Sequence, residues 1–256
     1  MAIPKIIHYC WFGKNEMPLK EKECVAGWKK FYPDYEFKIW NEDNFDYNKC
    51  IYARQAYERG NYAFVSDYVR AKVLYEYGGI YLDTDVKIIK KLPNVPEKGF
   101  LGFERRKFIG TAVMAAEPGS ELIAELLDYY EQHEFVQQKG YIDSIANVSI
   151  LTDICRRKGL IPDGRKQKIE GFEIFSRELF YPKKLNENTF ETTGETCAIH
   201  MCSNSWMTER EKKRGNNKIW INVLRPVLIK IRCCLRKLLG DEMVRKIEII
   251  VRNKMK

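Results

Sequence analysis

The segment from Tyr62 to Val86 constrains the fold most, because it predicts a helix that runs directly into a strand. Apolar residues recur at helical spacing from Tyr62 to the pair Gly78-Gly79, where the helix is expected to stop. The next residues, IYLDTDV, predict a strand that carries two carboxylates one residue apart, Asp83 and Asp85. In an open α/β sheet, ligands bind outside the carboxyl ends of the strands, so the segment predicts an α/β fold with a site at this strand end.

The rest of the sequence alternates strand and helix patterns in the same way. Strands are expected at 5–13, 35–40, 80–86, 100–103, 110–116 and 196–202, and helices at 18–30, 62–79, 118–133 and 144–159. This alternation predicts an α/β domain in which at least some strands pair in parallel. We expect that domain to occupy residues 1–215 and to be followed by a helical tail at 216–256.

The net charge of +9 comes from the C-terminal end of the chain. Between Arg210 and Lys256 there are 15 basic and 4 acidic residues, whereas the preceding residues carry 29 basic and 31 acidic ones. A nucleic-acid-binding domain shows a basic patch or stripe on its folded part. We therefore expect no nucleic-acid partner.

The cysteines indicate a reducing compartment. The eight cysteines include no C-x2-C pair, and the histidines include no pair at zinc-site spacing. The first residues, MAIPKIIHYCWFG, do not show a secretory leader pattern, and no apolar run approaches the ~20 residues of a membrane span. These patterns predict reduced thiols and a cytoplasmic location.

The aspartate pair needs a compensating partner, since like charges one residue apart repel. Residues i and i+2 of an extended strand point the same way, so Asp83 and Asp85 can face one cation, and oxygen ligands favour Mg2+ or Mn2+. Two alternatives are a solvated turn and a phosphatase of the haloacid dehalogenase type, whose strand also ends in D-x-D. In such phosphatases Thr or Val follows two residues after the second Asp, where this sequence has Lys87. Their motif also lies near the start of the chain, whereas here some 80 residues precede it.

The stretch FVSDYVRAKVLYEYGGIYLDTDV resembles the D-x-D sugar-binding region of the family 32 glycosyltransferases and, more distantly, the clostridial glucosylating toxins. The opening IPKIIHYCWFG and the late AIHMCSNSW match the same family in order and spacing, so the likeness covers most of residues 1–206. The resemblance implies a GT-A fold, which is a Rossmann-like mixed sheet flanked by helices. It also implies a nucleotide-sugar donor, a divalent metal and retention of anomeric configuration.

The resemblance implies roles for four charged residues. Asp85 is the expected direct metal ligand, and Asp83 is expected to contact the donor's ribose or sugar, or the metal through water. Asp67 and Arg70 share a helix face by their spacing, and the family's S-D-x-x-R pattern places them on the donor sugar's hydroxyls. The alternative for this second pair is a surface ion pair, which would contribute little.

The resemblance also implies donor contacts for residues near the two ends of the matching region. Trp11 is expected to stack on the nucleobase, with core packing as the alternative. The resemblance places His200 in the family's C-terminal element that completes the metal and diphosphate site, where a neutral imidazole suits Mn2+. The alternative is a structural histidine. Asn204, Ser205 and Trp206 would cap the diphosphate as a mobile loop.

Three polar residues are expected to stay outside the chemistry. His8, on the first strand, is predicted to be a buried, hydrogen-bonded structural residue. Asn147 and Asp153 could reach an acceptor pocket, but a helix cap and a solvated helix face explain them equally well.

The C-terminal segment predicts an amphipathic helix, because apolar residues recur at helical spacing between Trp220 and Leu239 and basic residues fill much of the remainder. Such a helix suits an anionic membrane surface, here the inner leaflet. The alternative is a helical hairpin packed on the catalytic domain.

Together these patterns predict a metal-dependent retaining glycosyltransferase. It would move a hexose from a nucleotide sugar, with a UDP-sugar as the first choice, to a surface polysaccharide such as a capsule or to a lipid-linked glycan. The alternative is a catalytically silent relative that binds glycan or membrane.

Overall fold

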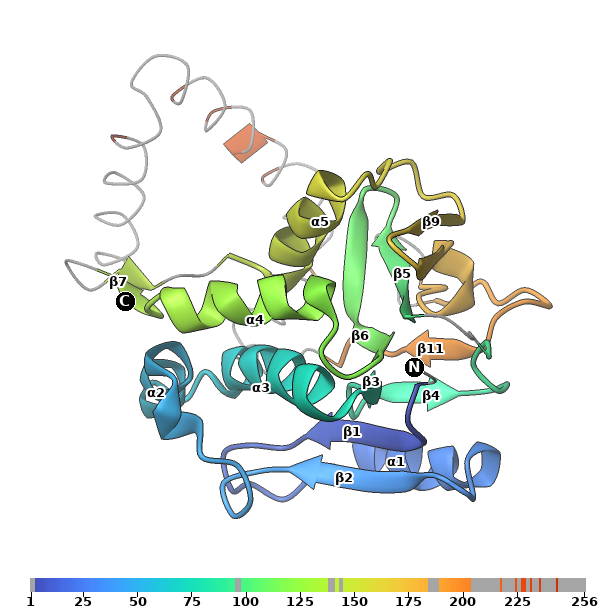
Figure 1. The fold of residues 1–256 in the computed structure, drawn as a ribbon, viewed down its shortest axis with the longest axis horizontal. Helices are drawn as coiled ribbons and strands as arrows, with labels where there is room; N and C mark the ends of the chain where they lie inside the picture. Colours follow the sequence, from blue (N-terminus) through green and yellow to red (C-terminus); the bar gives the residue numbers. More distant parts are fainter. Residues whose placement is uncertain are drawn as a thin grey trace. The chain divides into compact units, whose positions relative to one another are not determined.

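The computed structural model describes residues 3–94, 98–137, 141–142, 145–183 and 189–203, together with seven separate positions in the C-terminal segment. The chain divides into two units, Met1–Ser203 and Asn204–Lys256. In its described part the first unit is built on a central sheet with helices on both faces (Figure 1). The predicted domain boundary at residue 215 stays a prediction.

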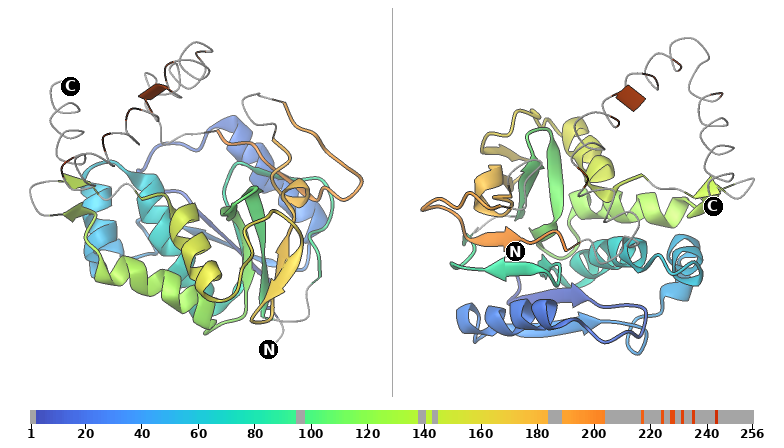
Figure 2. Two further views of the ribbon diagram at one scale, coloured as in Figure 1. Left: turned by 90° about the horizontal axis from the view of Figure 1, so that it is seen from above. Right: turned by 180° about the vertical axis from the view of Figure 1, so that it is seen from behind.

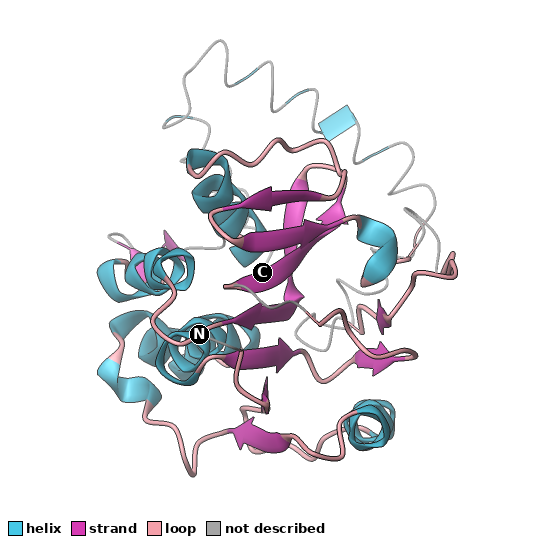
Figure 3. Ribbon diagram, turned by 45° about the vertical axis from the view of Figure 1, so that its right-hand side comes forward, coloured by secondary structure: helices cyan, strands magenta, loops and turns pink. Residues whose placement is uncertain are grey.

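The central sheet has seven strands in the order β2-β1-β3-β6-β5-β10-β9. Figure 3 shows its strands in magenta beside the helices in cyan. Their bounds are β1 Ile6–Cys10, β2 Glu36–Trp40, β3 Gly79–Leu82, β5 Gly99–Arg105, β6 Phe108–Ala116, β9 Gln167–Ile169 and β10 Phe172–Phe175. Strand β1 pairs in parallel with β2 and β3, whereas β6 is antiparallel to both β3 and β5. The sheet is therefore mixed, as the sequence predicts.

Two short ribbons lie outside the central sheet. Strand β4 (Val86–Ile88) pairs with β11 (Ala198–His200), and β7 (Val136–Gln137) pairs with β8 (Tyr141–Ile142), both in antiparallel register. The ribbon of β4 and β11 joins residues that are more than a hundred positions apart in the sequence. It thereby brings His200 to the turn that carries the aspartate pair.

The helices cover both faces of the sheet and bury a separate apolar core on each. Their bounds are α1 Leu19–Phe31, α2 Ile51–Glu58, α3 Tyr62–Tyr77, α4 Glu121–Gln132 and α5 Asn147–Arg157, with short 3-10 turns η1 Tyr47–Lys49 and η3 Arg177–Leu179. Side chains alternate between the faces, so that Tyr81 packs into the core under α2 to α5, while Ile80 and Leu82 pack into the core that holds Trp28 of α1. Figure 2 shows α1 across the sheet from the other helices.

Helix α3 passes into β3 through Gly78 and Gly79, both of which have positive φ values, 61° and 103°. A Cβ on Gly79 would lie 2.6 Å from the Ile6 carbonyl oxygen, and one on Gly78 would lie 2.6 Å from Pro118 Cδ. Only glycine accommodates both the backbone conformation and this close approach. The predicted helix stop is therefore confirmed, and it fixes α3 relative to the strand that leads to Asp83.

His8 is buried, as predicted, and connects β1 to this helix end. Trp40 Nε1 donates to His8 Nδ1 over 3.1 Å, so His8 carries its proton on Nε2 and donates it to the Gly78 carbonyl over 2.8 Å. Burial lowers the pKa of His8 to about 4. The side chain is therefore a neutral structural group, and its two hydrogen bonds join β1, β2 and the end of α3.

The prediction of one continuous strand through Asp83 and Asp85 is wrong. Strand β3 ends at Leu82, the Val86 amide donates to the Asp83 carbonyl over 3.0 Å, and β4 then leaves the central sheet to pair with β11. The pair therefore lies in a turn rather than on an extended strand. Its two carboxylates converge because the turn and the β4–β11 ribbon bring them together, and the alternation of side chains along a strand plays no part.

Candidate functional site

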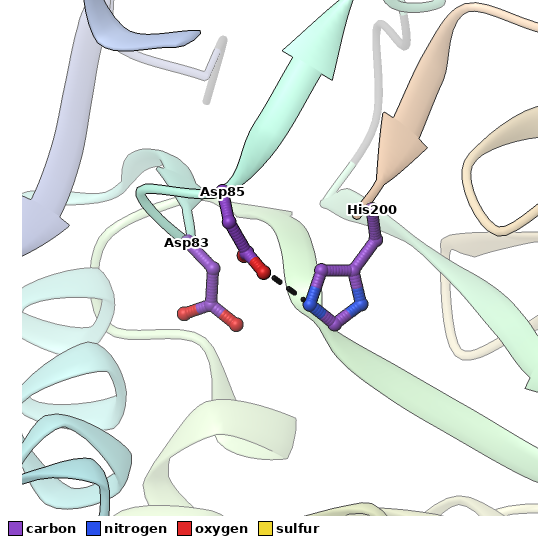
Figure 4. Close-up of side chains that lie close together, drawn as sticks. All are labelled: Asp83, Asp85 and His200. Atoms are coloured by element: carbon purple, nitrogen blue, oxygen red, sulfur yellow. Dashed lines mark ion pairs between the residues drawn. The ribbon is translucent and has the colours of Figure 1, made fainter. Parts of the chain in front are cut away.

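Three potential metal ligands meet beyond the carboxyl end of β3. Asp83 and Asp85 come from the turn, and His200 comes from the last position of β11, opposite Val86 (Figure 4). One ligand atom from each side chain lies within 4.8 Å of the other two. The structure thus brings together the three residues that the sequence singles out as metal ligands.

The Asp85 carboxylate is held at both oxygens. His200 Nε2 lies 3.3 Å from Oδ1, and the Ser203 amide donates to Oδ2 over 2.7 Å. Burial opposes ionisation of this carboxyl, but the contacts with His200 and Ser203 outweigh burial and lower the pKa of Asp85 to about 2. Asp85 is therefore ionised at neutral pH, as a metal ligand must be.

The His200 ring is positioned from three sides. Beyond the contact with Asp85, its Nδ1 lies 3.7 Å from Cys202 Sγ, and its ring meets the Tyr181 ring edge-on at 5.8 Å between centroids. Burial lowers the pKa of His200, but Asp85 and Cys202 act more strongly in the other direction, so the pKa is raised well above its usual value. The ring must give up its Nε2 proton when it ligates a metal.

This donor set fits a small divalent cation. Two carboxylates and one imidazole offer hard oxygen ligands with a single nitrogen, which suits Mn2+ or Mg2+. Three protein ligands leave further coordination positions for water or for oxygens of a bound molecule. The residues present therefore fit the predicted metal, with the imidazole favouring Mn2+.

Arg70 lies at the centre of a buried polar network beside the three ligands. Its NH2 group lies 3.0 Å from Asp67 Oδ1 and 3.2 Å from Asp83 Oδ1. Its NH1 group donates to the Thr111 carbonyl over 2.8 Å, and its Nε donates to the Ser66 carbonyl over 3.3 Å. The Arg70 side chain is only 6% exposed, so the alternative of a surface ion pair is wrong.

Tyr81 contacts the Arg70 guanidinium through its ring. The Arg70 Cζ atom lies 4.7 Å from the centre of the Tyr81 ring, and the Tyr81 hydroxyl donates to Asp83 Oδ1 over 3.1 Å. Tyr81 therefore orients Arg70 and the candidate metal ligand Asp83 together. Sequence reasoning assigned it no role, although its place two residues before Asp83 on a predicted strand was a usable signal.

Asn147 is a second residue that sequence reasoning set aside. At the start of α5, its side-chain amide donates to Asp67 Oδ1. Burial raises the pKa of Asp67 to about 6, while Arg70 and Asn147 favour the charged form. Asp153, by contrast, lies on the exposed face of α5 with Arg156, as predicted for a solvated face.

Trp11 lies at the same edge of the sheet as the aspartate turn. It follows β1, which runs parallel to β3, so the residues after both strands emerge on one side. Trp11 is half-buried, and its Nε1 donates to the Asn15 carbonyl over 2.6 Å. The predicted loop of Asn204, Ser205 and Trp206 lies outside the described residues.

Residues 18–101 match the family described as a glycosyltransferase sugar-binding region containing a DXD motif. That segment contains both aspartates of the turn and the buried pair Asp67 and Arg70. The match covers 84 of the 256 residues of the chain, which is therefore similar to the DXD glycosyltransferases over this segment. Three of its matches among characterised proteins show how far the likeness reaches.

Two curated relatives match part of this chain. It is 38% identical over 93 residues to inositol phosphoceramide mannosyltransferase 3 of Schizosaccharomyces pombe, covering 33% of this chain and 25% of the relative. It is 31% identical over 132 residues to lactosylceramide 4-alpha-galactosyltransferase of Mus musculus, covering 51% of this chain and 35% of the relative. The chain thus spans about a quarter to a third of the length of these two relatives.

A solved structure shares the fold. The PaToxG glycosyltransferase superimposes with a TM-score of 0.53 at 18% identity, over 62% of this chain and 70% of that chain. A mixed central sheet flanked by helices is the GT-A arrangement, and the predicted fold class is confirmed.

Proposed function

We propose that this protein is a metal-dependent glycosyltransferase that moves a hexose from a nucleotide sugar with retention of anomeric configuration. One observation carries the proposal: Asp83, Asp85 and His200 converge next to the buried pair of Asp67 and Arg70. In the proposed reaction, the three candidate ligands would hold the cation that binds the diphosphate, and the adjoining buried pair would bind the sugar. The family match and the GT-A fold support this interpretation.

The protein groups divide the work around the donor. Asp83, Asp85 and His200 would hold Mn2+ or Mg2+, which when bound would neutralise the charge that develops on the departing diphosphate. The contacts of Asp67 with Arg70 and Asn147 both fall on Oδ1. Asp67 Oδ2 would accept a hydrogen bond from a sugar hydroxyl, with the carboxylate held in place by its neighbours.

The nucleotide end of the donor would lie toward Trp11, which we propose stacks on a nucleobase, uracil being the first choice. Asn204, Ser205 and Trp206 remain the proposed cap over the diphosphate. Retention requires no general base from the protein when the departing phosphate takes the acceptor's proton on the same face. The proposed reaction therefore needs positioning and charge stabilisation more than proton transfer by a side chain.

The acceptor we propose is a lipid-linked glycan or a surface polysaccharide, reached from the cytoplasm. Both curated relatives are named for ceramide-based lipids, inositol phosphoceramide in one and lactosylceramide in the other. Of these two classes, the lipid-linked acceptor therefore has the more specific support.

A thermal-shift screen of nucleotide sugars, each with and without Mn2+, tests the proposal. Binding to the native state raises the unfolding temperature, so the screen reports the base, the sugar and the metal requirement together. We expect a metal-dependent rise with one class of nucleotide sugar, and release of free nucleotide from that donor when acceptor is added. Binding without turnover of any donor would favour the silent relative, and phosphate release from simple monoesters would favour the phosphatase.

A further inference from the structure

The described positions of the C-terminal unit expose an apolar stripe. Leu224, Val227, Leu228 and Ile231 are helical and 47% to 49% exposed. Their spacing of three, four and seven places all four on one face of a helix. Leu235, one turn further on, is helical and half-buried, so the stripe continues toward it.

The first unit shows no comparable feature within its described residues. Its exposed large apolar side chains are Leu19, Ile39, Ile51, Tyr75, Tyr77, Ile89, Ile145 and Ile161. None of these lies three or four positions from another, so they are scattered single residues of the kind found on any soluble surface. The helical repeat of exposed apolar residues is therefore specific to the C-terminal unit.

The sequence around the stripe is strongly basic. Residues 212–240 contain nine Lys or Arg and no Asp or Glu. The basic residues nearest the stripe are Arg225, Lys230, Arg232, Arg236 and Lys237. At 3.6 residues per turn this pattern predicts basic groups along both sides of the apolar stripe.

We infer that this stripe docks on an anionic phospholipid surface, with its apolar side chains among the acyl chains and its basic neighbours against the headgroups. A lipid surface is the one occupant that complements both features at once. The part of the chain before Arg210 carries a net charge of −2 and offers little to balance nine basic residues. A second copy of the segment would bring like charges together.

Within the described residues no helix is long and apolar enough to cross a membrane. Binding of this kind combines burial of apolar side chains with attraction to anionic lipid, and only the second part is screened by salt. The inference stands apart from the proposed function, because vesicle binding is measured without donor or acceptor.

Flotation of the full-length protein with vesicles tests the inference. The vesicles are phosphatidylcholine alone or phosphatidylcholine with one quarter phosphatidylglycerol. We expect binding to the anionic vesicles at low salt, and binding at least tenfold weaker to neutral vesicles or in about 0.5 M salt. Equal binding to both kinds of vesicle, or to neither, would overturn the inference.

A matched pair of variants separates the stripe from a general surface effect. The double variant Leu228→Glu, Ile231→Glu should lose at least tenfold in affinity for anionic vesicles, with an unchanged circular dichroism spectrum. Ile161→Glu, at a 64% exposed position of the first unit, should bind as the wild type does. The inference is overturned if the double variant still floats with anionic vesicles. It is also overturned if the wild type forms dimers through the stripe and does not bind vesicles.

Discussion

Arg70 and Asp83 are joined by an ion pair of 3.2 Å, which fastens helix α3 to the turn that carries the DXD motif. The same guanidinium holds Asp67 at 3.0 Å. One buried cation therefore sets the positions of a candidate metal ligand and a candidate sugar ligand. Any change that loosens it should disturb both halves of the proposed donor site together.

Arg70→Lys should lower the free energy of unfolding by about 3 kcal/mol, because a buried carboxylate loses its partner. A single ammonium cannot reproduce the planar contacts that Arg70 makes with Asp67, Asp83 and Thr111. Urea denaturation measures the loss, and turnover of the donor identified by the thermal screen should fall at least tenfold.

The matched control for that variant is Arg156→Lys. Arg156 pairs with Asp153 over 3.1 Å at side chains that are 42% and 63% exposed, so the change should alter stability by less than about 0.5 kcal/mol. If the two lysine variants were equally stable, Arg70 would not have the central position assigned to it.

Asn147→Ala should raise the KM for the donor by about tenfold, since Asp67 loses one hydrogen bond that holds its carboxylate in place. The pKa of Asp67 should rise further above its value of about 6, because that hydrogen bond favours the charged form. Steady-state kinetics between pH 6 and 8 measures both effects. Asp153→Ala, on the exposed face of the same helix, is the control, and equal effects of the two changes would remove Asn147 from the site.

His8 should make the protein sensitive to mild acid. Burial lowers its pKa from 6.5 in the unfolded chain to about 4 in the fold, so between these values the unfolded state binds more protons. Its contribution to stability is complete above pH 6.5 and is lost as the pH falls toward 4, by about 3 kcal/mol in total.

Urea denaturation of the wild type and of His8→Gln across this range isolates the histidine, because other carboxylates titrate in both proteins. The difference in unfolding free energy between wild type and variant should shrink as the pH falls. A difference that stays constant from pH 7 to pH 4 would show that His8 is not held neutral by burial.

The local sequence was sufficient to predict those helices and strands that are determined by contacts between residues close in the chain. Helix α3, its stop at Gly78 and the start of β3 follow from helical spacing and from the double glycine. The sequence also singled out Asp83, Asp85 and His200 as candidate ligands, which the fold brings within 4.8 Å of one another.

Long-range pairing explains what the sequence could not show. The chain turns at Asp83 because β4 pairs with β11, and no pattern within residues 80–86 reports a partner at residues 198–200. Asn147 reaches Asp67 across 80 positions for the same reason. Helix α2 and strands β9 and β10 are short, so their patterns are weak compared with the tertiary contacts that stabilise them.

The most direct test is a titration of the protein with Mn2+, followed by the electron paramagnetic resonance signal of the free ion. The wild type should bind one Mn2+, more tightly when UDP is present, and Asp153→Asn should bind it equally well. Asp85→Asn and His200→Gln should each weaken binding at least tenfold. If both variants bound Mn2+ as the wild type does, the ion would not be held by Asp83, Asp85 and His200.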